Sequence, residues 1–136
     1  METRIGVFVC NCGEGMKNVD FDGLIKKTAS VPGVISVTLN RDLCLDEGRK
    51  KMMSLVRDKG VDRVVVAACS PDSKEDIFRQ ALEGTGLNGN LLSMANIREQ
   101  CSWSHEGDVT GKAVELVMMA IERARLLRPV ERRELP

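Results

Sequence analysis

Short β-rich runs alternate four times with longer helical patterns along this chain, and this alternation limits the possible folds more than any other feature. The β-rich runs cover residues 4–9, 33–39, 62–68 and 91–95. Helical spacing of apolar residues follows at about 20–30, 46–59, 73–83 and 108–127. Each amphipathic helix must cover a face of the sheet, so this order predicts parallel strands joined by right-handed crossovers. We expect an α/β three-layer sandwich with a four-stranded parallel sheet, flavodoxin-like or Rossmann-like.

One of these runs is expected at the centre of the sheet. Residues 64–68 are apolar without alternation, which is typical of a strand buried on both faces. The 136 residues are enough for one hydrophobic core. We therefore expect a single α/β domain over residues 1–127. The charged segment 128–136 has no apolar period and is predicted to be a linker or tail.

All five cysteines follow the predicted strands. Cys10 and Cys12 close the first run in VFVCNCG, Cys44 follows the second, Cys69 ends the third and Cys101 follows the fourth. The carboxyl ends of parallel strands lie on one edge of a sheet, where cofactor sites form. The five thiols are therefore expected to converge at this edge, brought together by the fold and not by one short loop.

The residues beside the cysteines suit sulfur in its anionic form. Gly13 and Gly15 allow the backbone of the first loop to approach an inorganic ligand, and amides there are predicted donors to sulfide. Ser70 ahead of Pro71, and Asp46 after the second loop, are predicted helix caps. A helix N-terminus favours a negative charge by about 0.3–1 kcal/mol, so it tunes such a site without creating it.

Composition excludes several classes of function. The net charge is zero, basic residues are scattered and aromatic residues make up 3% of the chain, so nucleic acid is not an expected partner. No signal-peptide pattern and no apolar stretch long enough to span a bilayer is present, so we expect a cytoplasmic protein without membrane insertion. Thiols in that compartment stay reduced, which favours metal or redox chemistry over disulfides.

Three kinds of chemistry are compatible with converging thiols. An iron-sulfur cluster is the leading interpretation, and structural zinc is its main competitor because four thiolates also suit zinc. Thiol redox chemistry at the C-x-C pair or at Cys69 is the third, although no C-x-x-C is present. For Cys10, the last residue of an apolar run, simple burial is as good an interpretation as metal binding.

Three of the cysteine segments resemble a known family. VFVCNCG, VVVAACSP and above all MANIREQCSW are similar to the N-terminal domain of the heterodisulfide reductase A subunit, an iron-sulfur flavoprotein of methanogens and many anaerobic bacteria. The resemblance covers about residues 4–130. It implies a cluster-binding domain that carries one 4Fe-4S cluster, ahead of an FAD domain and ferredoxin-type domains. No G-x-G-x-x-G follows a strand here, so FAD is expected only on the domain that would follow.

The resemblance also implies the ligands. Cys44, Cys69 and Cys101 would bind the cluster, and Cys10 or Cys12 would supply the fourth thiolate. Cys12 is favoured because it lies beyond the strand in the glycine loop, with Cys10 as the alternative. Zinc would be a possible substitute for the cluster in recombinant protein.

Further residues are expected to surround the cluster without binding it, namely Asn11, Gly13, Ser70, Asn96, Arg98, Trp103 and His105. Family members often have His at the position of Asn11, a difference expected to alter the surroundings more than the ligands. Asn96 and Arg98 are predicted either to bond to the cluster loops or to form an ordinary cap and surface ion pair. Trp103 would shield the cluster, dock a partner or pack in the core. His105 is expected to be a solvated loop residue more often than a ligand.

The function implied is outer-sphere transfer of single electrons, with no independent catalysis. The expected partners are the FAD domain and the ferredoxin-type domains or subunits of a heterodisulfide reductase-like complex. The chain ends about where the family's linker to the flavin domain would begin. It is therefore expected to be either an excised fragment or a freestanding paralogue.

Overall fold

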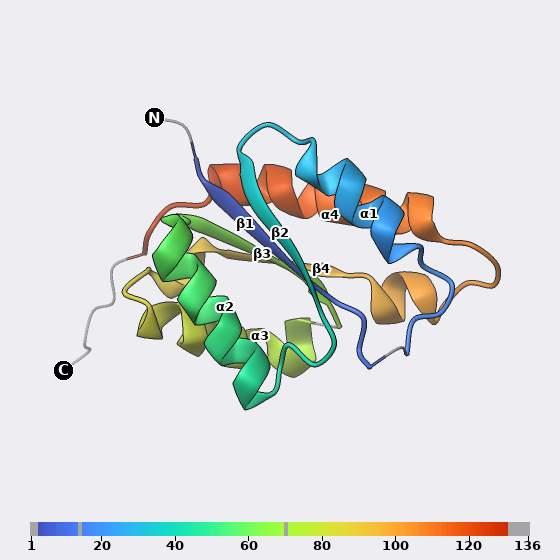
Figure 1. Ribbon diagram of the computed structural model, residues 1–136, viewed down its shortest axis with the longest axis horizontal. Coiled ribbons are helices and arrows are strands. Elements are labelled where there is room, and N and C mark those ends of the chain that lie inside the picture. Colours follow the sequence, from blue (N-terminus) through green and yellow to red (C-terminus); the bar gives the residue numbers. More distant parts are fainter. Residues whose placement is uncertain (1–2, 14, 70, 131–136) are drawn as a thin grey trace.

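The computed structural model describes residues 3–13, 15–69 and 71–130, and it places four strands between two layers of helices (Figure 1). The strands are β1 (Ile5–Cys10), β2 (Val34–Asn40), β3 (Arg63–Ala68) and β4 (Leu92–Asn96). The helices are α1 (Phe21–Ala29), α2 (Asp46–Lys59), α3 (Pro71–Gly84) and α4 (Thr110–Leu126). A short 3-10 helix, η1 (Gly89–Leu91), precedes β4, and a π-helical turn, η2 (Arg98–Ser102), follows it.

The four strands form one parallel sheet in the order β2-β1-β3-β4. The chain first adds β2 on one side of β1 and then crosses back to place β3 on the other side. This reversal lies between β1 and β3, and such a point leaves room at the carboxyl edge of a sheet for a ligand or cofactor. The predicted α/β three-layer fold is confirmed.

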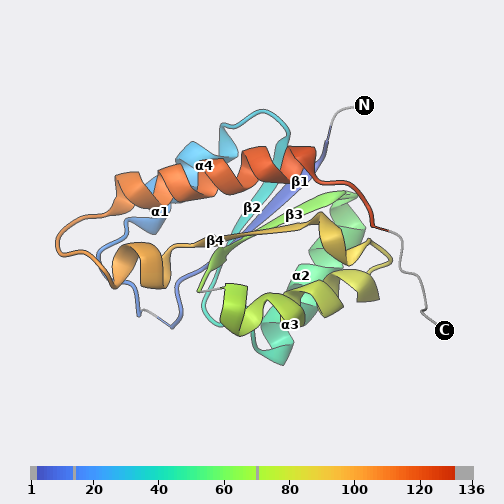
Figure 2. The same cartoon turned by 180° about the vertical axis from the view of Figure 1, so that it is seen from behind.

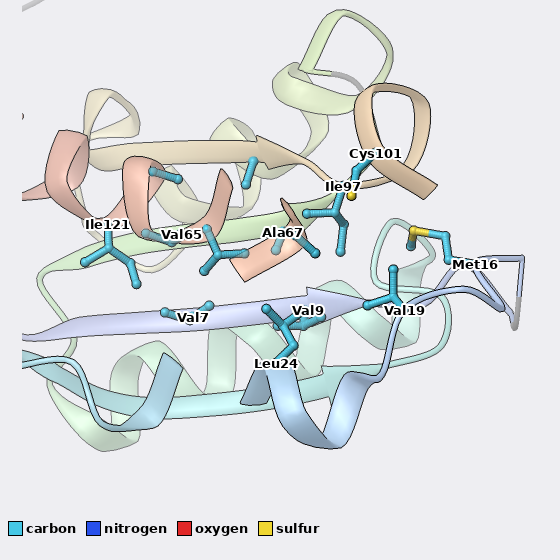
Figure 3. Close-up of a cluster of buried hydrophobic side chains, with 14 of the residues drawn as sticks. Val7, Val9, Met16, Val19, Leu24, Val65, Ala67, Ile97, Cys101 and Ile121 are labelled. Atoms are coloured by element: carbon cyan, nitrogen blue, oxygen red, sulfur yellow. The ribbon is translucent and has the colours of Figure 1, made fainter. Parts of the chain in front are cut away.

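The helices cover the sheet in two pairs. Helices α1 and α4 lie on one face, and α2 and α3 lie on the other (Figures 1 and 2). Side chains alternate along β1, so Val7 and Val9 enter the core under α1 and α4, whereas Phe8 enters the core under α2 and α3. We call these the α1/α4 core and the α2/α3 core. Figure 3 shows part of the α1/α4 core.

Strand β3 is the buried centre that its sequence predicts. Residues Val64 to Ala68 are at most 2% exposed, and they contribute to both cores. Strand β2 is an edge strand, and its residues are only partly buried. The sheet therefore offers a rigid centre from which the loops after β1 and β3 project.

The segment after α4 is attached to the domain as far as it is described. Asn88 Nδ2 donates to the carbonyl oxygen of Val130 at 2.7 Å, and Asn90 Nδ2 donates to that of Arg128 at 2.9 Å. The remainder of the predicted tail, residues 131–136, lies outside the described residues. Across the part of the chain that is described, no helix has both the length and the apolar character needed to cross a membrane.

Candidate metal centre

Cys10 ends β1 with its sulfur held by backbone groups. The N–H groups of Cys12 and Leu43 point at Cys10 Sγ from 3.4 and 3.5 Å, and the carbonyl oxygen of Arg41 lies 3.3 Å from it. The side chain is 4% exposed and belongs to the α2/α3 core. Two N–H donors at one sulfur favour its thiolate form.

The thiols of Cys10 and Cys12 form an unequal pair. A hydrogen bond from the Cys12 thiol lowers the pKa of Cys10 to about 6, assisted by the backbone N–H groups of Leu43 and Cys12 and opposed by burial. The same hydrogen bond raises the pKa of Cys12, and burial adds to this effect. Negative charge in the metal-free pair is therefore favoured on Cys10 over Cys12.

Cys12 occupies an unusual backbone conformation. Its φ is +53°, and Gly13 follows with φ +62°, so two successive left-handed residues turn the chain after β1. Left-handed backbone is uncommon for a residue with a side chain and clusters at functional sites. The Cys12 side chain packs against both cores. The amide of Cys12 points at Cys10 Sγ, and the amides of Gly13 and Gly15 donate to Arg41 O and Cys12 O at 2.8 and 3.1 Å. Donation from this loop to cluster sulfide stays a prediction.

Cys44 and Cys69 lie on the α2/α3 side of the carboxyl edge. Cys44 is half-buried in the loop between β2 and α2, and Cys69 is buried directly after β3. Burial raises the pKa of Cys69. Ser70, predicted to cap the next helix, lies outside the described residues, although α3 does begin at Pro71 as expected.

The predicted cap at Asp46 is wrong. The residue in the extended N-cap conformation is Leu45, with φ −82° and ψ 163°, and it makes no side-chain cap hydrogen bond. Asp46 is already helical and forms an ion pair with Arg49 one turn later. A carboxylate in the first turn still favours the helix electrostatically, and α2 begins at residue 46 as its apolar spacing predicts.

Cys101 lies at the same edge, but its thiol is buried in the α1/α4 core. It sits in the π-helical turn η2, is fully buried and has Sγ 3.6 Å from the carbonyl oxygen of Val109. Burial raises its pKa. Figure 3 shows Cys101 in this core together with Met16 and Val19. Cys10, Cys44 and Cys69 pack instead in or against the α2/α3 core.

Asn96 and Arg98 adopt both of the roles considered for them. The Oδ1 atom of Asn96 accepts hydrogen bonds from the N–H groups of Glu99 and Gln100, so Asn96 caps η2. Arg98 forms an ion pair with Glu99 at 2.5 Å and also reaches the first cysteine loop, with Nη1 3.5 Å from Cys12 Sγ.

Three further residues predicted to surround the cluster differ in their exposure and in their contacts. Trp103 is 58% exposed, which excludes the core-packing alternative, and its indole stacks on the guanidinium of Arg98 at 4.4 Å. His105 is exposed and contacts Ser104 and Lys112, as a loop residue would. Asn11 lies between the paired cysteines, and its buried Oδ1 has no hydrogen-bond partner within the described structure.

The parallel sheet brings the cysteine-bearing strand ends to one edge, but the thiols themselves do not meet at one point in this structure. Among the described residues, no three His, Cys, Asp or Glu side chains lie together as a ready-made metal site. The donor set itself is chemically uniform, because all five candidates are free thiols, the ligands that iron-sulfur clusters and zinc both accept.

Two residues that act on the cysteine site, Leu43 and Glu99, are not singled out by the sequence pattern. Leu43 acts through its backbone N–H, which every residue except proline possesses. Glu99 fixes the guanidinium of Arg98, and only its place in the distinctive MANIREQCSW segment draws attention to it.

Comparison with known proteins identifies relatives of this chain. No family model matches it. It is 42% identical over 134 residues to the A subunit of H(2):CoB-CoM heterodisulfide,ferredoxin reductase from Methanothermobacter thermautotrophicus, covering 96% of this chain and 20% of that protein. It is 40% identical over 136 residues to a protein of Archaeoglobus profundus named as similar to the heterodisulfide reductase A subunit, covering 97% and 19%.

A third relative, from Methanocaldococcus jannaschii, is named as the iron-sulfur A subunit of CoB--CoM heterodisulfide reductase and is 38% identical over 134 residues. This match covers 96% of this chain and 20% of the relative. The chain thus spans about a fifth of the length of the curated relatives it matches. It corresponds to a segment of the heterodisulfide reductase A subunit, as the resemblance predicts.

Proposed function

We propose that this chain is an iron-sulfur domain of a heterodisulfide reductase-type oxidoreductase, and that it holds one 4Fe-4S cluster for the transfer of single electrons. The observation that carries the proposal is the position of all five cysteines, with free thiols, at or beyond the carboxyl ends of the strands of one parallel sheet. Support comes from relatives named as iron-sulfur subunits.

The proposed ligands are Cys12, Cys44, Cys69 and Cys101. Cys44 and Cys69 belong to the α2/α3 side and Cys101 to the α1/α4 side, while Cys12 packs against both cores. Cys12 is therefore placed to join the two groups. Cys10 is the alternative fourth ligand, but its sulfur is already engaged by the backbone groups at the end of β1.

Binding by Cys101 has a structural consequence. Its thiol must leave the carbonyl oxygen of Val109 before it can act as a ligand. The residue lies in a π-helical turn, a type of segment found often at functional sites. We therefore expect η2 to be the segment that rearranges when the site is filled.

In this proposal the chain holds and positions the cluster without catalysing a reaction by itself. The cluster would supply one-electron chemistry, and the chain would set the potential through burial and N–H donors. In the longer relatives, an FAD domain and ferredoxin-type domains or subunits are the proposed electron partners. We propose that the protein works in a reducing cytoplasm, where free thiols such as these five persist, and the family resemblance extends this proposal to an anaerobe.

Thiol redox chemistry is a second candidate that one observation favours. Cys10 and Cys12 lie two residues apart where β1 ends, and the Cys12 side chain together with backbone N–H groups lowers the pKa of Cys10 to about 6. A thiolate beside a second thiol is the arrangement that forms and breaks disulfides. If this function holds, the pair should oxidise reversibly in protein that binds no iron.

Anaerobic reconstitution with iron and sulfide tests the proposal. We expect a brown protein with about four irons and four sulfides per chain, measured chemically and by visible and electron paramagnetic resonance spectra. A colourless protein that binds one zinc and no iron would contradict it. Thiol redox chemistry would instead give a reversible disulfide, detected by mass, without bound iron.

Single replacements of the cysteines identify the ligands. Cys44→Ala, Cys69→Ala and Cys101→Ala should each lose most of the iron. Cys12→Ala should do the same, while Cys10→Ala should retain the cluster as its matched control two residues away. The opposite result for the last two variants would make Cys10 the fourth ligand.

A further inference from the structure

Arg98 lies between the first cysteine loop and the surface of the molecule. Its Nη1 is 3.5 Å from Cys12 Sγ, and the indole of Trp103 lies 4.4 Å from its Cζ. Its remaining donors, Nε and Nη2, hold Glu99 Oε1 at 2.9 and 2.5 Å. The planar guanidinium of Arg98 thus contacts a sulfur, a carboxylate and an indole at once. Lysine has no planar group that could make these three contacts.

A second link joins the same two segments. Trp103 Nε1 donates to the carbonyl oxygen of Gly15 at 2.9 Å, and the N–H of Gly15 donates to the carbonyl oxygen of Cys12 at 3.1 Å. Two side-chain contacts therefore join η2 and its C-terminal end to the loop of Cys12, one made by Arg98 and one by Trp103. Movement of either segment would be transmitted to Trp103.

Arg98 is also placed to act on two of the proposed ligands by its charge. Its positive charge favours the thiolate of Cys12 and that of Cys69. Glu99, the ion-pair partner of Arg98, opposes this effect at Cys69. Lys112, on α4, is the cation that acts on Cys101 instead.

We propose that Arg98 is a positioning residue for the cysteine site, and that it couples the state of Cys12 to the exposed indole of Trp103. This inference rests on the proposed cluster function in one respect, namely that Cys12 and not Cys10 is the fourth ligand. A cation against one ligand sulfur should raise the midpoint potential of a bound cluster, because it stabilises the more negative reduced state. The link between Arg98, Cys12 and Trp103 itself does not require the cluster.

Fluorescence of the metal-free protein tests that link directly. Trp103 is the single tryptophan and the chain has no tyrosine, so the emission reports on this one side chain. We expect Arg98→Met to shift the emission maximum and to increase quenching by acrylamide, and Arg98→Lys to have a smaller effect. Cys12→Ala should also alter the emission.

Arg79→Met is the matched control for this experiment. Arg79 also forms an ion pair with a glutamate, Glu75, and its side chain is partly exposed like that of Arg98, at 33% against 22%. It lies on α3 and should leave Trp103 emission unchanged. If Arg98→Met and Arg79→Met give the same emission and quenching, the proposed coupling is wrong. If Arg98→Met does not fold, Arg98→Lys and Cys12→Ala still decide the question.

The reconstituted protein tests the effect on the cluster. We expect Arg98→Met to lower the midpoint potential and to speed cluster loss, with Arg98→Lys close to wild type and Arg79→Met equal to it. An unchanged potential in Arg98→Met overturns the electrostatic part of the inference. Failure of the wild-type protein to bind iron would count against the proposed function alone, since the fluorescence comparison is made without metal.

Discussion

At the scale of the residue, the first loop gives two neighbouring cysteines different surroundings. Cys10 receives two backbone N–H groups, whereas Cys12 faces the cation of Arg98. Both environments stabilise a negative sulfur, but only Cys10 has its pKa lowered, since the hydrogen bond between the two thiols favours charge on one at the expense of the other. A metal ion or cluster would replace this competition by binding one sulfur directly.

The lowered pKa of Cys10 predicts the pH dependence of the metal-free protein. Its folded value of about 6 lies below the ordinary value of 9.0. The resulting stabilisation is therefore fully present above pH 9 and is lost as the pH falls through 6. Titration of the ultraviolet thiolate absorbance should show one thiolate forming near pH 6, and Cys10→Ser should remove it.

Two variants of Cys12 serve as controls for this titration. Cys12→Ser keeps a hydroxyl donor and should keep the low pKa of Cys10. Cys12→Ala removes the donor and should move the midpoint upward. A wild-type protein without a thiolate transition below pH 8 would contradict the prediction.

Asn96 predicts a stability effect at a single side chain. Its Oδ1 accepts from the N–H groups of Glu99 and Gln100, and the residue is 7% exposed. Asn96→Ala should lower the free energy of unfolding by about 0.5–2 kcal/mol, because it removes the acceptor of two partly buried N–H groups at the start of η2. Asn96→Asp keeps the acceptor and should cost less. Urea denaturation measures both, and a neutral Asn96→Ala would show that η2 does not depend on this cap.

At the scale of the element, the repeating pattern of the sequence predicts most of what is seen. The bounds of α2 are predicted to the residue, and each strand lies within one residue of its predicted range. The carboxyl-edge position of the cysteines follows from the same alternation. The direction of the Cys101 thiol does not, because a π-helical turn and contact with Val109 decide it, and both depend on packing that strand periodicity cannot encode. Leu45 likewise replaces Asp46 as the N-cap because backbone conformation, not side-chain preference, sets the start of α2.

Helix α2 and the loop of Cys44 meet at a glycine, and this contact predicts a sensitive position. A Cβ at Gly48 would lie 2.5 Å from Asp42 O and 2.7 Å from Leu43 Cα, both backbone atoms that cannot move aside cheaply. Gly48→Ala should therefore destabilise the protein by about 1–3 kcal/mol, as overpacking does. It should also displace Leu43, whose N–H points at Cys10 Sγ.

Gly111 provides the matched control on another helix. It lies in the first turn of α4, and a Cβ there would meet no atom within 4 Å. Gly111→Ala should be neutral or stabilise the protein by up to about 1 kcal/mol, since glycine loses more freedom in a helix. Thermal unfolding of the two variants checks the contrast. Equal midpoints would show that the Cys44 loop yields to a side chain at Gly48.

At the scale of the whole molecule, the proposed ligands come from both sides of the sheet. Cys44 and Cys69 belong with the α2/α3 core, Cys101 with the α1/α4 core, and Cys12 with both. Each core packs against one face of the same sheet, and no described cysteine pair yet connects them by a bond. A cluster bound by all four would therefore fasten the two layers of helices to each other at the carboxyl edge.

This arrangement predicts that loading the site stabilises the entire domain. A ligand that binds only the folded state adds about 2.7 kcal/mol at one hundred times its dissociation constant. For a domain of this size, each kcal/mol raises the unfolding midpoint by roughly 2–8 °C. Reconstituted protein should therefore unfold at a higher temperature than metal-free protein in anaerobic calorimetry, and removal of iron by a chelator should reverse the shift.

Two cysteine variants serve as controls for this experiment. Cys101→Ala should abolish the difference between the two forms, because the α1/α4 side then loses its ligand, while Cys10→Ala should preserve it. Equal midpoints for loaded and metal-free wild type would mean that any bound iron does not join the two layers.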